Sequence, residues 1–153
     1  MRAFEEVTGF LDDQGVAYRV LEHEPYSTTE EAGQRAGIRP RQGAKSMLFS
    51  SLGEHVLAVV PADQRVSYKK MRKILGTSNL RLASPEEVMD TMGCEVGTCH
   101  PFGNLIGART LVDPSMGDES EIVFNAGYNT RSLFVAYVDY ERIVSPELHD
   151  IKN

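Results

Sequence analysis

The sequence predicts an α+β domain built on a mixed, largely antiparallel curled sheet flanked by helices. Two observations predict this class: β-rich runs outnumber the helical patterns, and they follow one another without regular βαβ alternation. A third observation concerns size, because 153 residues that are 41% apolar can supply one hydrophobic core. We therefore expect a single domain over residues 1–153, without a flexible linker.

The N-terminal part predicts two helices around a strand. Apolar residues recur at helical spacing before Gly15, at Phe4, Val7, Phe10 and Leu11. A β-like run over 16–21 follows. Residues 27–30 then have the S/T-x-x-E form of a capping box, which predicts a short helix ending near Gly37.

The middle of the chain predicts a hairpin and two capped helices. A loop over 39–43 precedes β-rich runs at 44–51 and 54–60, which are separated by a Leu-Gly turn, and Lys45 begins the first of these strands. Ser67 caps a helix that ends at Gly76. A second capping box starts at Ser84, with Pro85 at the first helical position, and that helix ends at Gly93.

The C-terminal part predicts three strands, over 108–112, 121–125 and 132–138. Turn-rich segments separate them, around Pro114 and around Gly127.

Charge and hydropathy exclude several classes of protein. The net charge of −6 argues against a protein that coats DNA or RNA non-specifically, because that mode neutralises many phosphates with Lys and Arg. The longest apolar run, over 56–61, is too short to span a bilayer, and the N-terminus lacks a signal-peptide core. We expect a soluble cytoplasmic protein whose two cysteines, Cys94 and Cys99, remain thiols.

The segment over 97–103, here called the 97–103 loop, is the strongest candidate for chemistry. Glycine allows close approach to the main chain, and Pro101 restricts the loop, so backbone N–H groups can be held outward. Lys45 can add positive charge from a neighbouring strand. This combination predicts a hydrolytic site without a nucleophilic side chain and without a metal or cofactor. In isolation, however, a lysine at a strand start is usually solvated, and a glycine with a nearby proline is usually an ordinary turn.

Cys99 beside His100 invites two other interpretations. A cysteine hydrolase is disfavoured because adjacent residues in an extended loop project to opposite sides. A zinc site using Cys94, Cys99 and His100 is disfavoured because no C-x-x-C pair or second ligand cluster is present.

One basic cluster stands out in this acidic chain, on the helix after Arg65. A solvated helix face and a local contact with RNA are both open interpretations. Its members are Arg65, Lys69, Lys70, Arg72 and Lys73.

The order of motifs resembles the YbaK and ProX type of aminoacyl-tRNA deacylase, which also occurs as the editing insertion of bacterial prolyl-tRNA synthetases. The resemblance rests on residues 18–23, 43–46, 57–63, 97–103 and 124–127 taken together. It implies the mixed sheet wrapped by helices that the residues predict. It further implies a pocket for the 3′-terminal adenosine and its esterified amino acid, lined by Lys45 and the loop from Gly97 to Pro101.

The resemblance gives each candidate residue a role. Lys45 would orient the substrate, and Gly97 would help to position the attacking water. The remaining pocket candidates are His23, Thr98, Cys99, His100, Pro101, Asn125 and Gly127. His23 is equally compatible with a loop histidine bonded to backbone, and Asn125 and Gly127 with a bulge at a strand end. Family loops more often carry small or hydroxyl residues at positions 99 and 100, which leaves the amino-acid specificity open.

The resulting prediction is an enzyme that hydrolyses mischarged aminoacyl-tRNA in trans, with Ala- or Cys-tRNA(Pro) as first candidates. It would recognise the acceptor end, with prolyl-tRNA synthetase as a possible partner. The alternative is a non-catalytic module that binds aminoacyl-tRNA, an amino acid or a nucleotide. A general RNA-binding protein fits the acidic composition least.

Overall fold

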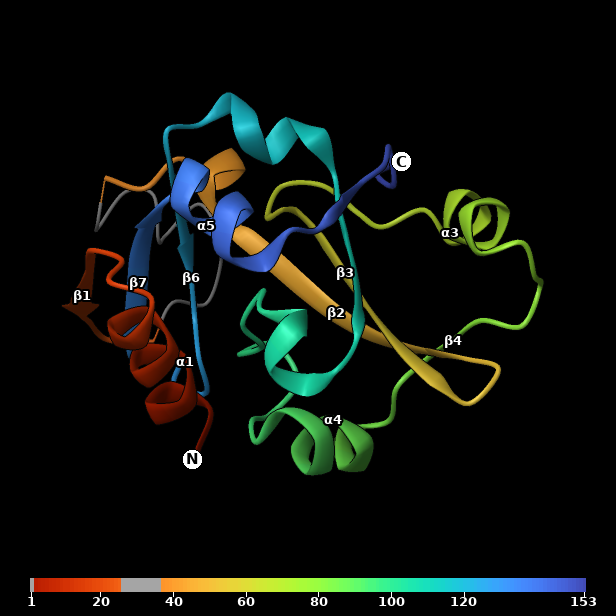
Figure 1. Cartoon of the computed structure of the whole chain (residues 1–153), viewed down its shortest axis with the longest axis horizontal. Coiled ribbons are helices and arrows are strands. Elements are labelled where there is room, and N and C mark those ends of the chain that lie inside the picture. The colour runs from red at the N-terminus through yellow and green to blue at the C-terminus, as the bar shows by residue number, and fades with distance from the viewer. Residues whose placement is uncertain (1, 26–36) are drawn as a thin grey trace.

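Two β-sheets form the centre of the molecule (Figure 1). The computed structural model describes residues 2–25 and 37–153. The first sheet has the order β1 (Tyr18–Glu22), β7 (Arg131–Ala136), β6 (Glu121–Phe124), and both of its pairs are antiparallel. The second has the order β4 (Arg81–Leu82), β2 (Ala44–Ser51), β3 (Glu54–Pro61), β5 (Arg109–Val112), β8 (Glu147–Leu148).

The second sheet is mixed. Strands β4, β2 and β3 pair antiparallel, whereas β3–β5 and β5–β8 are parallel. A single parallel bridge between Gly43 and Val123 joins the start of β2 to β6 and links the two sheets into one curled surface. The predicted fold class, α+β with a mixed curled sheet, is confirmed.

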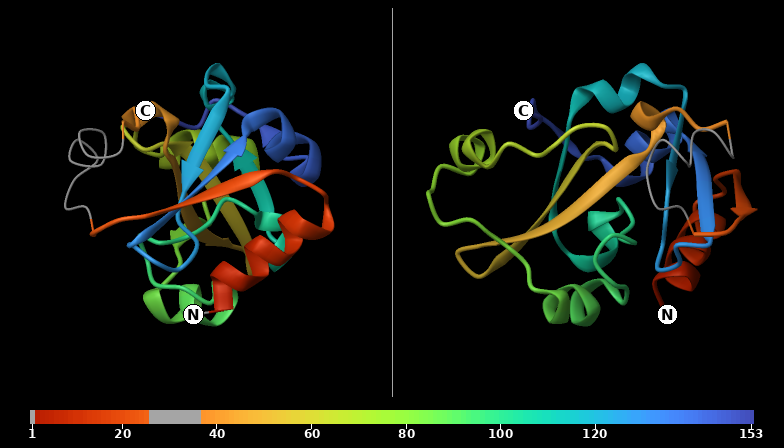
Figure 2. Two further views of the ribbon diagram at one scale, coloured as in Figure 1. Left: turned by 90° about the vertical axis from the view of Figure 1, so that its left-hand side faces the viewer. Right: turned by 180° about the vertical axis from the view of Figure 1, so that it is seen from behind.

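Helices flank both sheets, as the two further views also show (Figure 2). They are α1 (Arg2–Asp13), α3 (Tyr68–Leu75), α4 (Pro85–Met92) and α5 (Tyr137–Val144), with short 3₁₀ turns η1 (Pro40–Gln42), η2 (Gly103–Ile106) and η3 (Pro114–Asp118). Helix α1 buries Ala3, Val7 and Leu11, one face of an amphipathic helix.

The predicted caps of α3 and α4 are confirmed. The Ser67 hydroxyl accepts the N–H of Lys70, and Ser84 forms a complete capping box with Glu87. Gly76 and Gly93 end the two helices. Gly93 therefore ends α4 and directs the chain toward the 97–103 loop.

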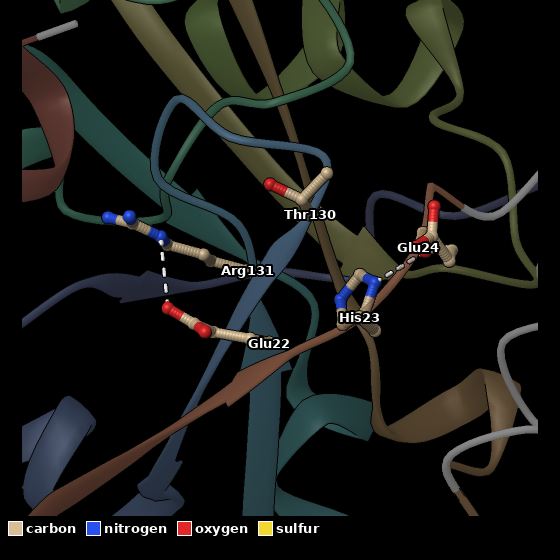
Figure 3. Close-up of a pocket in the computed structure, with 5 residues that line it drawn as sticks. All are labelled: Glu22, His23, Glu24, Thr130 and Arg131. Atoms are coloured by element: carbon tan, nitrogen blue, oxygen red, sulfur yellow. Dashed lines mark hydrogen bonds and ion pairs between the residues drawn. The ribbon is translucent and has the colours of Figure 1, made fainter.

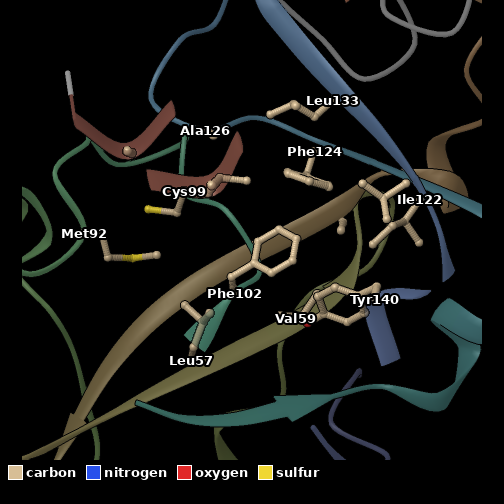
Figure 4. Packing of buried hydrophobic residues seen from close by; sticks show 14 of the residues in the cluster. Leu57, Val59, Met92, Cys99, Phe102, Ile122, Phe124, Ala126, Leu133 and Tyr140 are labelled. Carbon is tan, nitrogen blue, oxygen red and sulfur yellow. The ribbon is translucent and has the colours of Figure 1, made fainter. Parts of the chain in front are cut away.

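The five-stranded sheet separates two hydrophobic clusters. The larger, inner cluster lies between the sheets and includes Leu57, Val59, Phe102 and Phe124 (Figure 4). The outer cluster lies under α3 and includes Phe49 and Met71. Successive side chains of β2 point to opposite faces of the sheet, so they alternate between the two clusters. Ala44 and Leu48 face the inner cluster, while Met47 and Phe49 face the outer one.

Three predictions need correction or lie beyond the described residues. The strand predicted over 132–138 ends at Ala136, and Tyr137 begins α5, because Tyr137 and Tyr140 both become buried at helical spacing. The segment predicted as a loop at 39–43 contains the 3₁₀ turn η1. The helix predicted to follow the capping box at 27–30 lies outside the described residues. In the part of the chain that is described, no helix has the length and apolar character to cross a membrane.

Candidate functional site

The 97–103 loop leaves α4 and is held at its first residues by short-range bonds. Thr98 donates both its N–H (3.1 Å) and its hydroxyl (2.7 Å) to the Glu95 carbonyl oxygen. Gly97 has φ +91°, and a Cβ built there would meet no atom of the described residues within 4 Å. The main chain at Gly97 therefore borders open space, as expected where a ligand approaches the backbone.

The middle of the loop turns its side chains inward. Cys99 is 8% exposed and His100 is fully buried. The Cys99 Sγ lies 3.7 Å from Cys94 Sγ, while His100 Nδ1 accepts the N–H of Phe102 at 3.1 Å. Cys99 and His100 therefore use different partners and do not form the nucleophile–base pair of a cysteine hydrolase.

Two backbone N–H groups in this buried stretch lack an acceptor within the described part of the chain. Among the residues that the structure describes, the N–H groups of Cys99 and His100 have no hydrogen-bond acceptor. Backbone N–H groups of this kind can stabilise a developing oxyanion when they are held in place. Tyr140 fixes the end of the stretch by donating its hydroxyl to the Pro101 carbonyl at 2.7 Å.

The turn after β6 lies directly against this loop. Gly127 donates its N–H to the Thr98 carbonyl at 2.9 Å. Asn125 closes the turn by donating its side-chain amide to the Tyr128 carbonyl at 2.7 Å. The structure thus brings together two of the segments singled out in the sequence.

His23 lies at the end of β1, opposite β7. Its Nε2 is 2.7 Å from the Ser132 hydroxyl, and its Nδ1 is 2.8 Å from the Glu24 carbonyl oxygen. Since a carbonyl can only accept, Nδ1 carries a proton, and in the neutral ring Nε2 accepts the Ser132 hydroxyl. His23 therefore makes the backbone bond that one interpretation predicts, and its other ring nitrogen bonds to a side chain of the sheet.

Lys45 lies on the outer side of β2, on the same side as Met47 and Phe49. Gly43 and Val123 form a parallel bridge. Lys45 follows Gly43 by two residues and Asn125 follows Val123 by two residues, so Lys45 and Asn125 lie side by side on the two adjacent segments. Alternation puts both on the outer side, because Ala44 and Phe124 face inward.

The Lys45 ammonium donates to the backbone carbonyl of Gln64, in the segment after β3. Burial lowers the pKa of Lys45, and the nearby charge of Arg65 lowers it further, while Asp63 opposes the shift. Lys45 and Arg65 are therefore electrostatic neighbours, which connects the candidate catalytic lysine to the start of the basic cluster.

A cleft of about 630 Å³ opens where β1 and β7 meet the turn at 128–130 (Figure 3). The ion pair of Glu22 and Arg131, 3.7 Å apart, lies on one side, and His23 on the other. The Arg131 guanidinium also lies 4.7 Å from the centre of the Tyr128 ring. The cleft is lined by Glu22, His23, Glu24, Thr130 and Arg131.

The basic cluster divides into two parts. Lys70 is held by the carboxylate of Asp150 at 3.0 Å and by the Lys152 carbonyl oxygen at 2.7 Å. The other four basic side chains are exposed and make no ion pair with any described residue: Arg65, Lys69, Arg72 and Lys73. These four, here called the basic patch, are the part available to an anionic ligand.

Sequence reasoning missed the residues that hold the candidates in place. The sequence places Ser132 in a strand and gives no site role to Gln64, Arg131 or Tyr140. Their roles depend on which strands pair and how α5 packs, and the local pattern around each gives no signal of that.

Comparisons with known proteins agree with this fold. A model of the aminoacyl-tRNA editing domain matches residues 23–143. The multifunctional Ser/Thr-tRNA deacylase ProXp-y of Escherichia coli (strain K12) is 32% identical over 149 residues, covering 94% of this chain and 89% of that protein. The prolyl-tRNA editing protein ProX of Acetoanaerobium sticklandii is 25% identical over 151 residues, covering 94% and 92%.

A solved structure, of a protein described as a trans-editing enzyme for prolyl-tRNA synthetase, supports the fold. It superposes with a TM-score of 0.88 at 24% identity, covering 100% of this chain and 98% of that one. The family predicted from the motifs is thereby confirmed, and the chain belongs to the aminoacyl-tRNA editing domain family.

Proposed function

We propose that this chain hydrolyses the ester bond of mischarged aminoacyl-tRNA in trans, acting as one domain. The carrying observation is the backbone at the start of the 97–103 loop, where Gly97 is exposed and borders open space and the N–H group of Cys99 has no acceptor among the described residues. The similarity to ProXp-y and ProX, which their names describe as a deacylase and an editing protein, supports the same reaction.

The loop backbone would position water and stabilise charge. The water oxygen attacks the carbonyl carbon of the ester, and the bond from that carbon to the ribose oxygen breaks. The water proton passes to the ribose oxygen, so the products are a free amino acid and a tRNA with its terminal hydroxyl restored. One rigid donor to the oxyanion is typically worth about 2.7–4 kcal/mol of transition-state stabilisation.

Lys45 would orient the substrate and need not act as a base. Its hydrogen bond to the Gln64 carbonyl fixes the direction of its side chain, and Arg65 nearby adds positive charge. The terminal phosphate or ribose of the tRNA is the group that such a pair would contact. His23, Asn125, Gly127 and the backbone of the loop from Thr98 to Pro101 would complete the pocket.

The substrates we propose carry small amino acids. A synthetase pocket rejects a side chain that lacks one methylene by only about 1–3 kcal/mol, so a second site that admits the smaller residue restores fidelity. Ala- and Cys-tRNA(Pro) are the first candidates. Esters of serine and threonine are the second, because ProXp-y is named a Ser/Thr-tRNA deacylase.

The basic patch would bind the acceptor end of the tRNA. Lys69, Arg72 and Lys73 project from α3, and Arg65 lies beside Lys45, so phosphates bound on α3 could lead toward the lysine. A prolyl-tRNA synthetase is the candidate partner that would supply tRNA selection.

A deacylation panel tests the proposal. Ala-, Cys-, Ser-, Thr- and Pro-tRNA(Pro) are each incubated with the protein, and the remaining ester is measured. Loss of a mischarged species with Pro-tRNA(Pro) spared supports editing. Stability of every ester, with measurable binding, supports the alternative of a non-catalytic module.

A further inference from the structure

The peptide group between Pro101 and Phe102 is hydrogen-bonded on both sides by buried side chains. The Tyr140 hydroxyl donates to its carbonyl oxygen at 2.7 Å, and His100 Nδ1 accepts its N–H at 3.1 Å. Because the C=O and N–H belong to one planar unit, these two bonds together determine how that unit is rotated.

The residues on both sides of this peptide group are held in place, so rotation of the peptide plane is its main remaining motion. Proline fixes the backbone on one side. On the other side, the Phe102 ring is packed edge-on against Phe124 and Tyr140, at centroid distances of 5.3 and 5.5 Å. With both neighbours held, the two hydrogen bonds set the direction of the chain as it leaves the loop.

The bonding of His100 identifies its protonation state. Nδ1 accepts a hydrogen bond, so the neutral ring carries its proton on Nε2. That Nε2 is buried and has no partner among the described residues, which costs free energy. Histidine is therefore not the choice that stability alone would favour at this position.

We propose that His100 and Tyr140 are positioning residues for deacylation. By fixing the Pro101–Phe102 peptide they hold the preceding loop backbone, from Gly97 to Cys99, in the orientation that the ester requires. The opposite end of the stretch is held by the bond from Gly127 to Thr98, so both ends are fixed. This inference rests on the proposed function.

Substitutions that replace only one of the two ring nitrogens of His100 test the positioning role. Asparagine places an acceptor oxygen where Nδ1 lies, whereas glutamine reaches only the position of Nε2. We expect His100→Ala and Tyr140→Phe to lower kcat about 10-fold with KM nearly unchanged. His100→Asn restores kcat, and His100→Gln does not.

Tyr137→Phe is the matched control, because it removes a hydroxyl from the same helix, and that hydroxyl makes no hydrogen bond within the described residues.

Amide hydrogen exchange supplies a readout that does not depend on turnover. The Phe102 N–H should exchange slowly in wild type, faster in His100→Ala and slowly again in His100→Asn. Wild-type kcat in both His100→Ala and Tyr140→Phe overturns the inference, as does rescue by glutamine in place of asparagine. If wild type hydrolyses no ester, the proposed function fails separately, and unchanged exchange in His100→Ala would still overturn the positioning role.

Discussion

Gly127 donates its backbone N–H to the carbonyl oxygen of Thr98 at 2.9 Å. This bond joins the turn after β6 to the 97–103 loop, and Gly127 reaches it with φ +92°. Since residues other than glycine seldom adopt this conformation, the contact explains why glycine occupies position 127. The backbones of the two loops are thus joined beside the candidate site.

Replacing Gly97 should impair catalysis more than folding. Alanine at φ +91° costs about 1–2 kcal/mol of backbone strain, and its Cβ would project into the open space where the ester approaches. We expect Gly97→Ala to lower kcat/KM at least ~10-fold. Gly53→Ala is the control, because Gly53 also has a positive φ and open space but lies at the β2–β3 turn. Equal activity of the two variants would contradict a role for the Gly97 backbone.

The basic patch should control affinity for tRNA. Changing Lys69, Arg72 and Lys73 together to glutamine removes three exposed charges that have no acidic partner among the described residues. We expect a higher KM for tRNA, an unchanged kcat, and a shallower dependence of log Kd on log salt, by roughly 0.7–0.9 for each phosphate that the variant no longer neutralises. Arg142→Gln on α5 serves as a control because that arginine pairs with Asp139. An unchanged salt slope in the triple variant would place the tRNA elsewhere.

The Cys99 thiol should be dispensable for the reaction. Its Sγ is turned toward Cys94, and the hydrogen bond with Cys94 together with burial raises the pKa of Cys99, so a thiolate is disfavoured. We expect Cys99→Ala to retain kcat within a few-fold, measured on protein whose circular dichroism is unchanged. A loss of activity of about 100-fold or more would revive the cysteine-hydrolase interpretation.

His100 should make stability depend on pH in the acid range. Burial lowers the pKa of His100 to about 4, from an ordinary value near 6.5. In the unfolded chain His100 has its ordinary pKa and binds a proton more readily than in the folded protein. The contribution of neutral His100 to the free energy of unfolding is therefore complete above pH ~6.5 and is lost as the pH falls toward 4. Between pH 7 and 4.5 we expect wild type to lose about 2 kcal/mol more unfolding free energy than His100→Asn. Urea unfolding at both pH values measures this, and parallel losses in the two proteins would contradict it.

Local signals predicted most helices and the hairpin correctly. Ser67, Ser84, Gly76 and Gly93 mark the ends of α3 and α4 because caps depend on nearby backbone groups. The start of α5 was predicted as the end of a strand because residues 132–138 are rich in aromatic and β-branched residues. Its helical form is determined by the burial of Tyr137 and Tyr140, which only the tertiary structure provides.

The sequence could name candidate site residues but could not give their arrangement. Gly97, Gly127 and Lys45 could be singled out by residue type and resemblance. The partners that fix them could not, because Thr98 meets Gly127, and Lys45 meets Gln64, through contacts between distant segments. The parallel β3–β5 pair was likewise beyond local patterns, since strand order depends on long-range topology.

Single-turnover deacylation by wild type and Lys45→Ala, with tRNA binding measured separately, tests the central claim most directly. Arg81→Ala is the control, because Arg81 on β4 is an exposed cation that pairs with Glu87. We predict that wild type and Arg81→Ala clear a small mischarged ester while sparing Pro-tRNA(Pro), and that Lys45→Ala loses this hydrolysis about 100-fold yet still binds tRNA. Full hydrolysis by Lys45→Ala would contradict the assigned role of the lysine, and no hydrolysis by wild type would contradict the editing activity itself.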